Sequence, residues 1–101
     1  MKLYIDTADR EKVVVGIDNE RFETKAHERS SQELLPFIEK ILKKNGKTVK
    51  DITEIQVNTG PGSFTGLRVG LAVADTLGWI LKVPVNGVDI SKEGSVDIVY
   101  N

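Results

Sequence analysis

Residues 58–70 read NTGPGSFTGLRVG, a glycine-rich turn that leads directly into an apolar run. Residues 54–58, before it, are typical of a strand, and residues 63–82 are typical of a long helix. Pro84 limits that helix, because the residue before a proline avoids helical angles, and residues 85–88 indicate one more strand. A strand–helix–strand order predicts parallel strands joined by a right-handed crossover, so this stretch places the chain in the α/β class.

The first half of the chain precedes this unit with a different pattern. Three strand-like segments, 3–7, 12–17 and 21–26, predict an antiparallel meander. A helical period follows, after candidate N-caps at Ser30 and Ser31, and Pro36 inside it should kink the helix or delay its regular start. The apolar positions of this helix are Leu34, Leu35, Ile38, Ile41 and Leu42. We therefore expect one domain over residues 1–101, a three-stranded meander followed by helix, strand, helix and strand, with a short tail at 91–101 that could add a strand.

The composition narrows the function classes. The 101-residue chain has a formal net charge of -1 and contains no cysteine. A balanced charge argues against tight binding to nucleic acid by this chain alone. The missing cysteine excludes disulfides, thiol catalysis and cysteine metal sites. Asp6 interrupts the apolar start where a signal peptide would continue, so we expect a cytoplasmic protein.

The glycine-rich turn has two interpretations. A strand, a glycine turn and a helix N-terminus can bind an anion through free N–H groups and the helix dipole. The spacing matches neither a Walker A loop nor G-x-G-x-x-G, which favours a tight turn before a capped helix. An acid at the end of the first strand could hold a metal beside a phosphate, or could simply form a turn. The candidate phosphate or metal residues are Asp6, Thr7, Gly60, Gly62 and Ser63; we predict no catalytic residue and no intrinsic metal or cofactor site.

The second helix gives a stronger signal, for contact with another protein. Small residues recur every fourth position from Gly62 to Gly78, a pattern that allows close approach of another backbone. Apolar and small residues cover about 220° of the helix by wheel geometry, wider than one buried face needs. Packing of both helices on one sheet face remains the alternative, and Arg68 and Asp75 argue against a membrane span. The predicted interface residues are Leu34, Ile38, Ile41, Gly62, Phe64, Gly66, Leu67, Gly70, Leu71, Ala74, Gly78 and Trp79.

Three motifs in order, Ile5-Asp6-Thr7, Leu34-Leu35-Pro36 and GPGSFTGLRVG at 60–70, resemble the TsaB (YeaZ) family, over about residues 1–90. The resemblance implies a single ribonuclease-H-like, actin-like (ASKHA) lobe, without the second lobe that family members usually have. It implies a non-catalytic subunit that binds and activates a TsaD-like transferase, alongside a TsaE-like ATPase, in making threonylcarbamoyladenosine at position 37 of tRNA. ATP, ADP and metal are then expected on those partners, tRNA contact is indirect, and the two helices form the partner contact. Two alternatives stay open: a small nucleotide-binding or hydrolysing actin-like protein, and a module that associates with itself as a homodimer.

Overall fold

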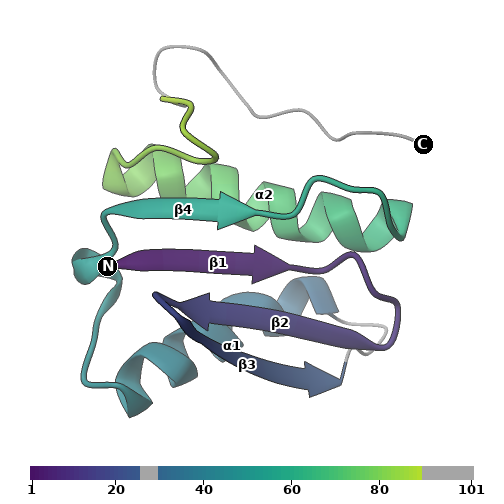
Figure 1. Cartoon of the computed structure of the whole chain (residues 1–101), viewed down its shortest axis with the longest axis horizontal. Coiled ribbons are helices and arrows are strands. Elements are labelled where there is room, and N and C mark those ends of the chain that lie inside the picture. The colour runs from purple at the N-terminus through teal and green to yellow at the C-terminus, as the bar shows by residue number, and fades with distance from the viewer. Residues whose placement is uncertain (26–29, 90–101) are drawn as a thin grey trace.

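The computed structural model describes residues 1–25 and 30–89, which form one mixed sheet with both helices on one of its faces (Figure 1). The sheet has four strands in the order β3-β2-β1-β4. The elements are β1 (Lys2–Asp6), β2 (Lys12–Ile17), β3 (Glu20–Lys25), α1 (Ser30–Lys44), the short 3-10 helix η1 (Val49–Asp51), β4 (Glu54–Val57) and α2 (Phe64–Leu81). The predicted α/β class, the meander and both helices are confirmed.

Strand β1 lies at the centre of the sheet, antiparallel to β2 and parallel to β4. Its residues alternate, so Leu3 and Ile5 are fully buried beneath the helices whereas Tyr4 points to the other face. In register, Tyr4 lies opposite Gly16 of β2 and Gln56 of β4. This alternation puts the core on the helical side of the sheet and leaves the other side polar.

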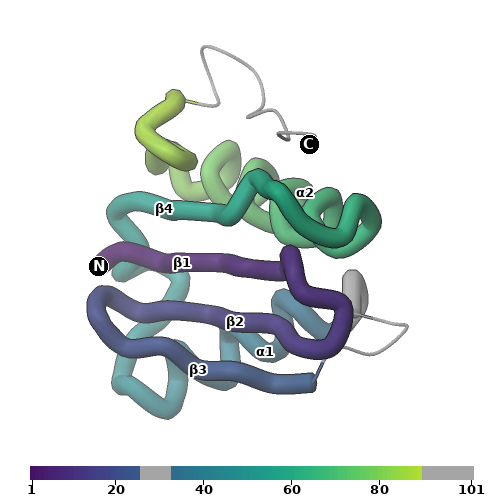
Figure 2. Tube along the Cα trace, turned by 45° about the vertical axis from the view of Figure 1, so that its right-hand side comes forward, coloured from purple at the N-terminus to yellow at the C-terminus, as the bar shows by residue number. Residues whose placement is uncertain are grey.

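The two helices contact each other and share the core between them. The first helix turns Leu34 and Ile38 inward and contains the exposed Pro36; its start is not delayed, and the kink expected as the alternative stays a prediction. The second helix begins after Ser63, whose side chain accepts from the Gly66 N–H as an N-cap. It ends at Lys82 in the left-handed conformation. Figure 2 shows α2 running alongside β4.

The predicted fifth strand is wrong in extent. Val85 forms only isolated bridges, parallel to Ile55 and antiparallel to Val88, and the chain reverses between them at Asn86 and Gly87, both with positive φ. The Asn86 side chain completes the pairing of β4: its Oδ1 accepts from the Val57 N–H at 2.8 Å and its Nδ2 donates to the Val57 carbonyl at 3.0 Å. The strand-like run predicted at 96–100 lies outside the described residues.

Candidate functional site

The glycine-rich turn lies where β1 and β4 end, beside the first turn of α2. Thr7, which is buried, donates its hydroxyl hydrogen to the Gly66 carbonyl. The Ser63 N–H donates to the Ala8 carbonyl at 2.8 Å. The structure thus brings the predicted residues Thr7, Ser63 and Gly66 together, as a set of bonds that ties β1 to α2.

Asp6 is held in a second set of contacts at the same edge. Its Oδ1 accepts from the Ala8 N–H at 3.0 Å and from the Asn58 side chain at 3.2 Å, and its Oδ2 accepts from the Tyr4 hydroxyl at 3.1 Å. The Gly60 N–H in turn donates to the Asn58 side chain at 3.0 Å. Carboxylate and amide groups that could meet a phosphate or a metal are therefore already bonded within the chain, and phosphate or metal binding here stays a prediction.

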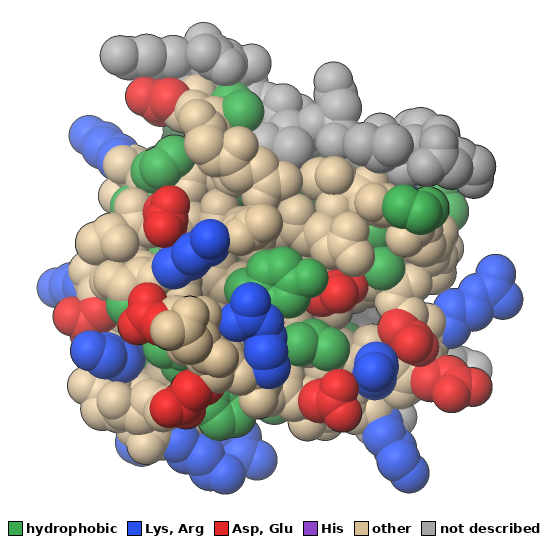
Figure 3. Space-filling model, viewed as in Figure 1, with side chains coloured by type: hydrophobic (Ala, Val, Ile, Leu, Met, Phe, Trp, Pro, Cys, Tyr) green, Lys and Arg blue, Asp and Glu red, His purple; other side chains and the backbone are tan. Residues whose placement is uncertain are grey.

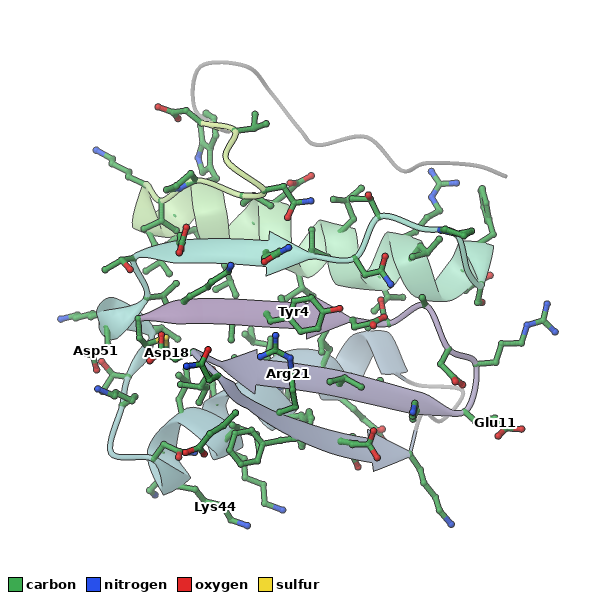
Figure 4. The ribbon with its side chains drawn as sticks, in the orientation of Figure 1. Tyr4, Glu11, Asp18, Arg21, Lys44 and Asp51 are labelled. Carbon is green, nitrogen blue, oxygen red and sulfur yellow. The ribbon has the colours of Figure 1, made fainter. Side chains whose placement is uncertain are left out.

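Tyr4 and Arg21 mark the centre of the open sheet face (Figure 4). The Arg21 guanidinium lies over the Tyr4 ring, 4.5 Å from its centroid. Burial, and then the charge and hydrogen bond of Asp6, raise the pKa of Tyr4 above its ordinary value, while Arg21 lowers it. Around this pair the face carries interspersed acidic and basic side chains (Figure 3). Across residues 1–25 and 30–89, no three His, Cys, Asp or Glu side chains are grouped as metal ligands.

The first members of the ladder of small residues face the chain's own sheet. A Cβ on Gly62 would lie 2.5 Å from the Ala8 Cβ. A Cβ on Gly66 would meet the Thr7 carbonyl oxygen, and one on Gly70 would meet the Thr7 Oγ1. These glycines let the first half of α2 approach the end of β1, so their close-packing role is internal.

Most of the predicted interface residues are likewise buried within the single chain. They lie at the contacts of α1 and α2 with the sheet and with each other, where they have little surface to lose to a partner. The buried residues of the predicted set are Leu34, Ile38, Ile41, Leu67, Gly70, Leu71, Ala74 and Gly78, and their role in a partner contact stays a prediction. Two predicted residues remain available on the outer side of α2: Phe64 is 51% exposed and Trp79 is 60% exposed.

The outer side of α2 is a mostly apolar surface, which we call the α2 outer surface. Its N-terminal part forms a shallow groove of about 390 Å³, and the Arg68 guanidinium lies 5.0 Å from the centroid of the Phe64 ring. Farther along the helix it includes Trp79 and Ile80, the latter 66% exposed. The groove is lined by Phe64, Thr65, Arg68, Val69, Ala72 and Val73.

The predicted interface set does not include four further residues of this surface, Val69, Ala72, Val73 and Ile80. Their signal was present, because the 100° step between successive helical residues places them on the same half of the wheel as Trp79. By length and composition alone, with a mean hydropathy of 1.3, α2 could also cross a membrane, a property shared by core helices of soluble proteins.

Comparison with known proteins identifies the family. The model of the family TsaD, tRNA N6-adenosine threonylcarbamoyltransferase, matches residues 23–91. The tRNA threonylcarbamoyladenosine biosynthesis protein TsaB of Escherichia coli is 37% identical over 90 residues, covering 85% of this chain and 38% of that protein. A tRNA N6-adenosine threonylcarbamoyltransferase of Nitrosospira multiformis is 44% identical over 55 residues, 54% of this chain and 16% of that protein.

The fold agrees with a solved relative. YeaZ from Pseudomonas aeruginosa superposes with a TM-score of 0.71 at 26% identity, over 83% of this chain and 41% of that one. The chain thus spans about two fifths of the length of the E. coli and P. aeruginosa relatives. The predicted actin-like lobe is confirmed by this match, and the chain belongs to the TsaB/YeaZ family, within the wider family that the TsaD model describes.

Proposed function

We propose that this chain is a non-catalytic subunit in tRNA threonylcarbamoyladenosine biosynthesis that binds and activates a TsaD-like transferase through the α2 outer surface. The names of its TsaB relatives support the pathway. The observation that carries the binding role is that Phe64, Trp79 and Ile80 stay exposed on α2 after its inner side has packed on the sheet. The catalytic groups, the nucleotide with its metal, and the contact with tRNA then belong to the partner proteins.

The physical character of the surface fits a protein contact. Phe64, Trp79 and Ile80 are each more than half exposed, which places three large apolar side chains along one helix. Phe64 and Ile80 are separated by sixteen residues, or roughly 24 Å at a rise of 1.5 Å per residue. Aromatic and arginine side chains dominate the residues that contribute most to binding. A helix or helix pair of the partner could lie along this length, as helices pack on each other in domain cores.

In this proposal the chain activates its partner by binding alone and supplies no catalytic group. The polar groups of the glycine turn are engaged in bonds that hold β1, β4 and α2 together, such as that of the Asp6 carboxylate with the Asn58 amide. A rigid surface can favour one conformation of a bound transferase by binding that conformation more tightly. We propose that activation takes this form.

The test compares two lysine substitutions in a mixture with the TsaD-like protein from the same organism. Trp79→Lys puts a charge at the C-terminal end of the proposed contact, whereas Gln56→Lys puts the same charge on the exposed, opposite face of the sheet. We expect a one-to-one complex by light scattering after size exclusion. The dissociation constant should rise at least ~10-fold for Trp79→Lys, about 1.4 kcal/mol, and stay unchanged for Gln56→Lys.

The other outcomes separate the remaining candidates. Equal binding by both variants would refute the α2 outer surface as the contact. A homodimer that ignores the TsaD-like protein and that Trp79→Lys disrupts would establish self-association instead. Heat on titration with ATP and magnesium that Asp6→Ala removes would establish the nucleotide-binding alternative, and its absence would eliminate it.

A further inference from the structure

The chain contains two Asn-Gly pairs, Asn45-Gly46 and Asn86-Gly87, and the structure surrounds them differently. An asparagine before glycine can deamidate spontaneously, because glycine has no side chain to hinder the attack of its backbone nitrogen on the asparagine amide. We propose that Asn86-Gly87 is a site of spontaneous deamidation in the folded protein, and that the reaction releases Val57 at the end of β4. This inference goes beyond the proposed function and does not depend on it.

The reaction needs only solvent water as a co-reactant. The Gly87 nitrogen forms a bond to the Asn86 Cγ while the bond from Cγ to Nδ2 breaks, and ammonia leaves with the proton of the Gly87 nitrogen. The product is a cyclic imide. Water then opens the ring at one of its two carbonyls, which leaves aspartate or, after attack on the backbone carbonyl, isoaspartate at position 86.

The attacking nitrogen is available in the 86–87 turn. The turn is closed by two backbone bonds between Val85 and Val88, each 2.9 Å long, and the Gly87 N–H has no hydrogen-bond partner among the described residues. Asn86 and Gly87 are both exposed. They line a hollow of about 440 Å³ whose other side chains are mostly polar, so water reaches the pair.

The fold also polarises the amide that is attacked. The Asn86 Oδ1, which gains negative charge during the attack, accepts from the Val57 N–H at 2.8 Å. A backbone N–H aimed at a developing oxyanion stabilises that charge, and loss of one such donor slows acyl-transfer enzymes by about 10²–10³-fold. Val57 therefore favours the reaction at Asn86 through its N–H, whereas its bond from the Asn86 Nδ2 is lost when ammonia leaves.

The Asn45-Gly46 pair provides the comparison within the same chain. The Gly46 N–H donates to the Lys43 carbonyl at 3.1 Å, so the attacking nitrogen is already engaged at the end of α1. The Asn45 Nδ2 donates to the Ile41 carbonyl at 2.8 Å, which holds the side chain against the helix. We therefore expect this pair to react more slowly than Asn86-Gly87 in the folded chain.

Deamidation changes the contact that closes the end of β4, an edge strand of the sheet (Figure 1). The Asn86 Nδ2 now donates to the Val57 carbonyl at 3.0 Å. An aspartate has no N–H at this place, so a negatively charged oxygen would face the carbonyl oxygen and be repelled by it. The side chain then leaves Val57, whose backbone N–H and carbonyl become accessible to solvent or to an incoming strand.

The test incubates the full chain at mildly alkaline pH, once folded and once in concentrated urea, and measures deamidation at both pairs by peptide mass spectrometry. We expect Asn86 to react at least ~10-fold faster than Asn45 in the folded chain, and at about the same rate in urea, where neither pair keeps its native bonds. Equal rates in the folded chain, or a faster reaction at Asn45, would overturn the proposal, because the contact with Val57 would then protect Asn86.

The consequence for β4 is measured on Asn86→Asp, which carries the acidic product, with Asn45→Asp as the control for the added charge. Amide hydrogen exchange of Val57, followed by NMR, should accelerate at least ~10-fold in Asn86→Asp and stay unchanged in Asn45→Asp. Unchanged protection of Val57 in Asn86→Asp would overturn the proposed release. No partner protein is present, so failure of either measurement leaves the transferase-binding test unaffected.

Discussion

The replacement Gly66→Ala tests whether the glycines of α2 serve the chain's own packing. Position 66 lies in the first turn of α2, where the missing side chain lets the helix approach the end of β1. An added Cβ would meet the Thr7 carbonyl oxygen, which is backbone and cannot rotate away. The helix N-terminus would have to move outward, and the bond from the Thr7 hydroxyl to the Gly66 carbonyl would be lost.

The expected change in the free energy of unfolding combines two destabilising effects with one stabilising effect. Overpacking of a close contact costs about 1–3 kcal/mol, and the backbone partner puts this case at the upper end. Loss of a buried hydrogen bond adds about 1 kcal/mol. Alanine regains up to ~1 kcal/mol of helix propensity over glycine. The free energy of unfolding should therefore fall by about 2–3 kcal/mol, a large part of the 5–15 kcal/mol typical of a small domain.

Urea denaturation followed by circular dichroism measures this change. Gly16→Ala is the matched control, because its Cβ would meet the end of the flexible Arg21 side chain, which can move aside. We expect the control to change stability by less than ~1 kcal/mol, within the range of surface substitutions. Gly66→Ala within ~0.5 kcal/mol of the unchanged chain would refute the internal explanation and return this glycine to the partner contact.

Three further predictions concern other parts of the molecule. Asn86→Gly keeps a residue suited to positive φ but removes the side-chain amide that accepts from the Val57 N–H. The amide hydrogen exchange of Val57, measured by NMR, should therefore accelerate at least ~10-fold. Asn19→Gly in the exposed β2–β3 turn is the control, and unchanged protection of Val57 in Asn86→Gly would contradict the prediction. The pKa of Tyr4 is raised in the folded state, so the contribution of this hydroxyl to the free energy of unfolding is present below pH 10 and is lost as pH rises above 10. Tyr4→Phe should therefore lose less stability at alkaline pH than the unchanged chain, as measured by urea titration. Identical pH profiles for the two proteins would count against this prediction. Pro36→Ala restores a backbone N–H inside α1 but makes the unfolded chain more flexible, which opposes part of the gain. We expect the free energy of unfolding to rise by about 1–2 kcal/mol after both effects. A loss of stability would show that the proline fits its site.

The local patterns of the sequence predicted the elements well because each has its own period or capping signal. The 12–17 segment is rich in β-branched residues and forms the six residues of β2, and the long helix expected at 63–82 is observed as Phe64–Leu81. Pro36 did not delay the start of α1, since helix packing on the sheet outweighed its local preference. The fifth strand was predicted too long for a different reason. Residues 85–88 have strand propensity, but Asn86 and Gly87 together favour a tight reversal.

The candidate site was harder to predict because a helical pattern does not say which side faces inward. The repeat of Gly62, Gly66 and Gly70 indicates close approach, and only the position of Thr7 in space shows that the approaching backbone is β1. Once that side is assigned to the sheet, the opposite side with Trp79 becomes the exposed one. The width of the apolar pattern indicated a second apolar side of the helix, and the choice of side required the fold.

The two edge strands of the sheet are protected from pairing with other chains in different ways, and this protection limits the number of surfaces through which the molecule can associate. At β4, the amide of Asn86 satisfies the outward N–H and carbonyl of Val57, so that edge offers less to an incoming strand. At β3, four of six residues are charged, which discourages edge-to-edge pairing. Within residues 1–25 and 30–89, neither sheet edge favours pairing with another chain, and our proposed function assigns association to the α2 outer surface alone. A molecule with a single attachment surface forms closed pairs and cannot grow into filaments.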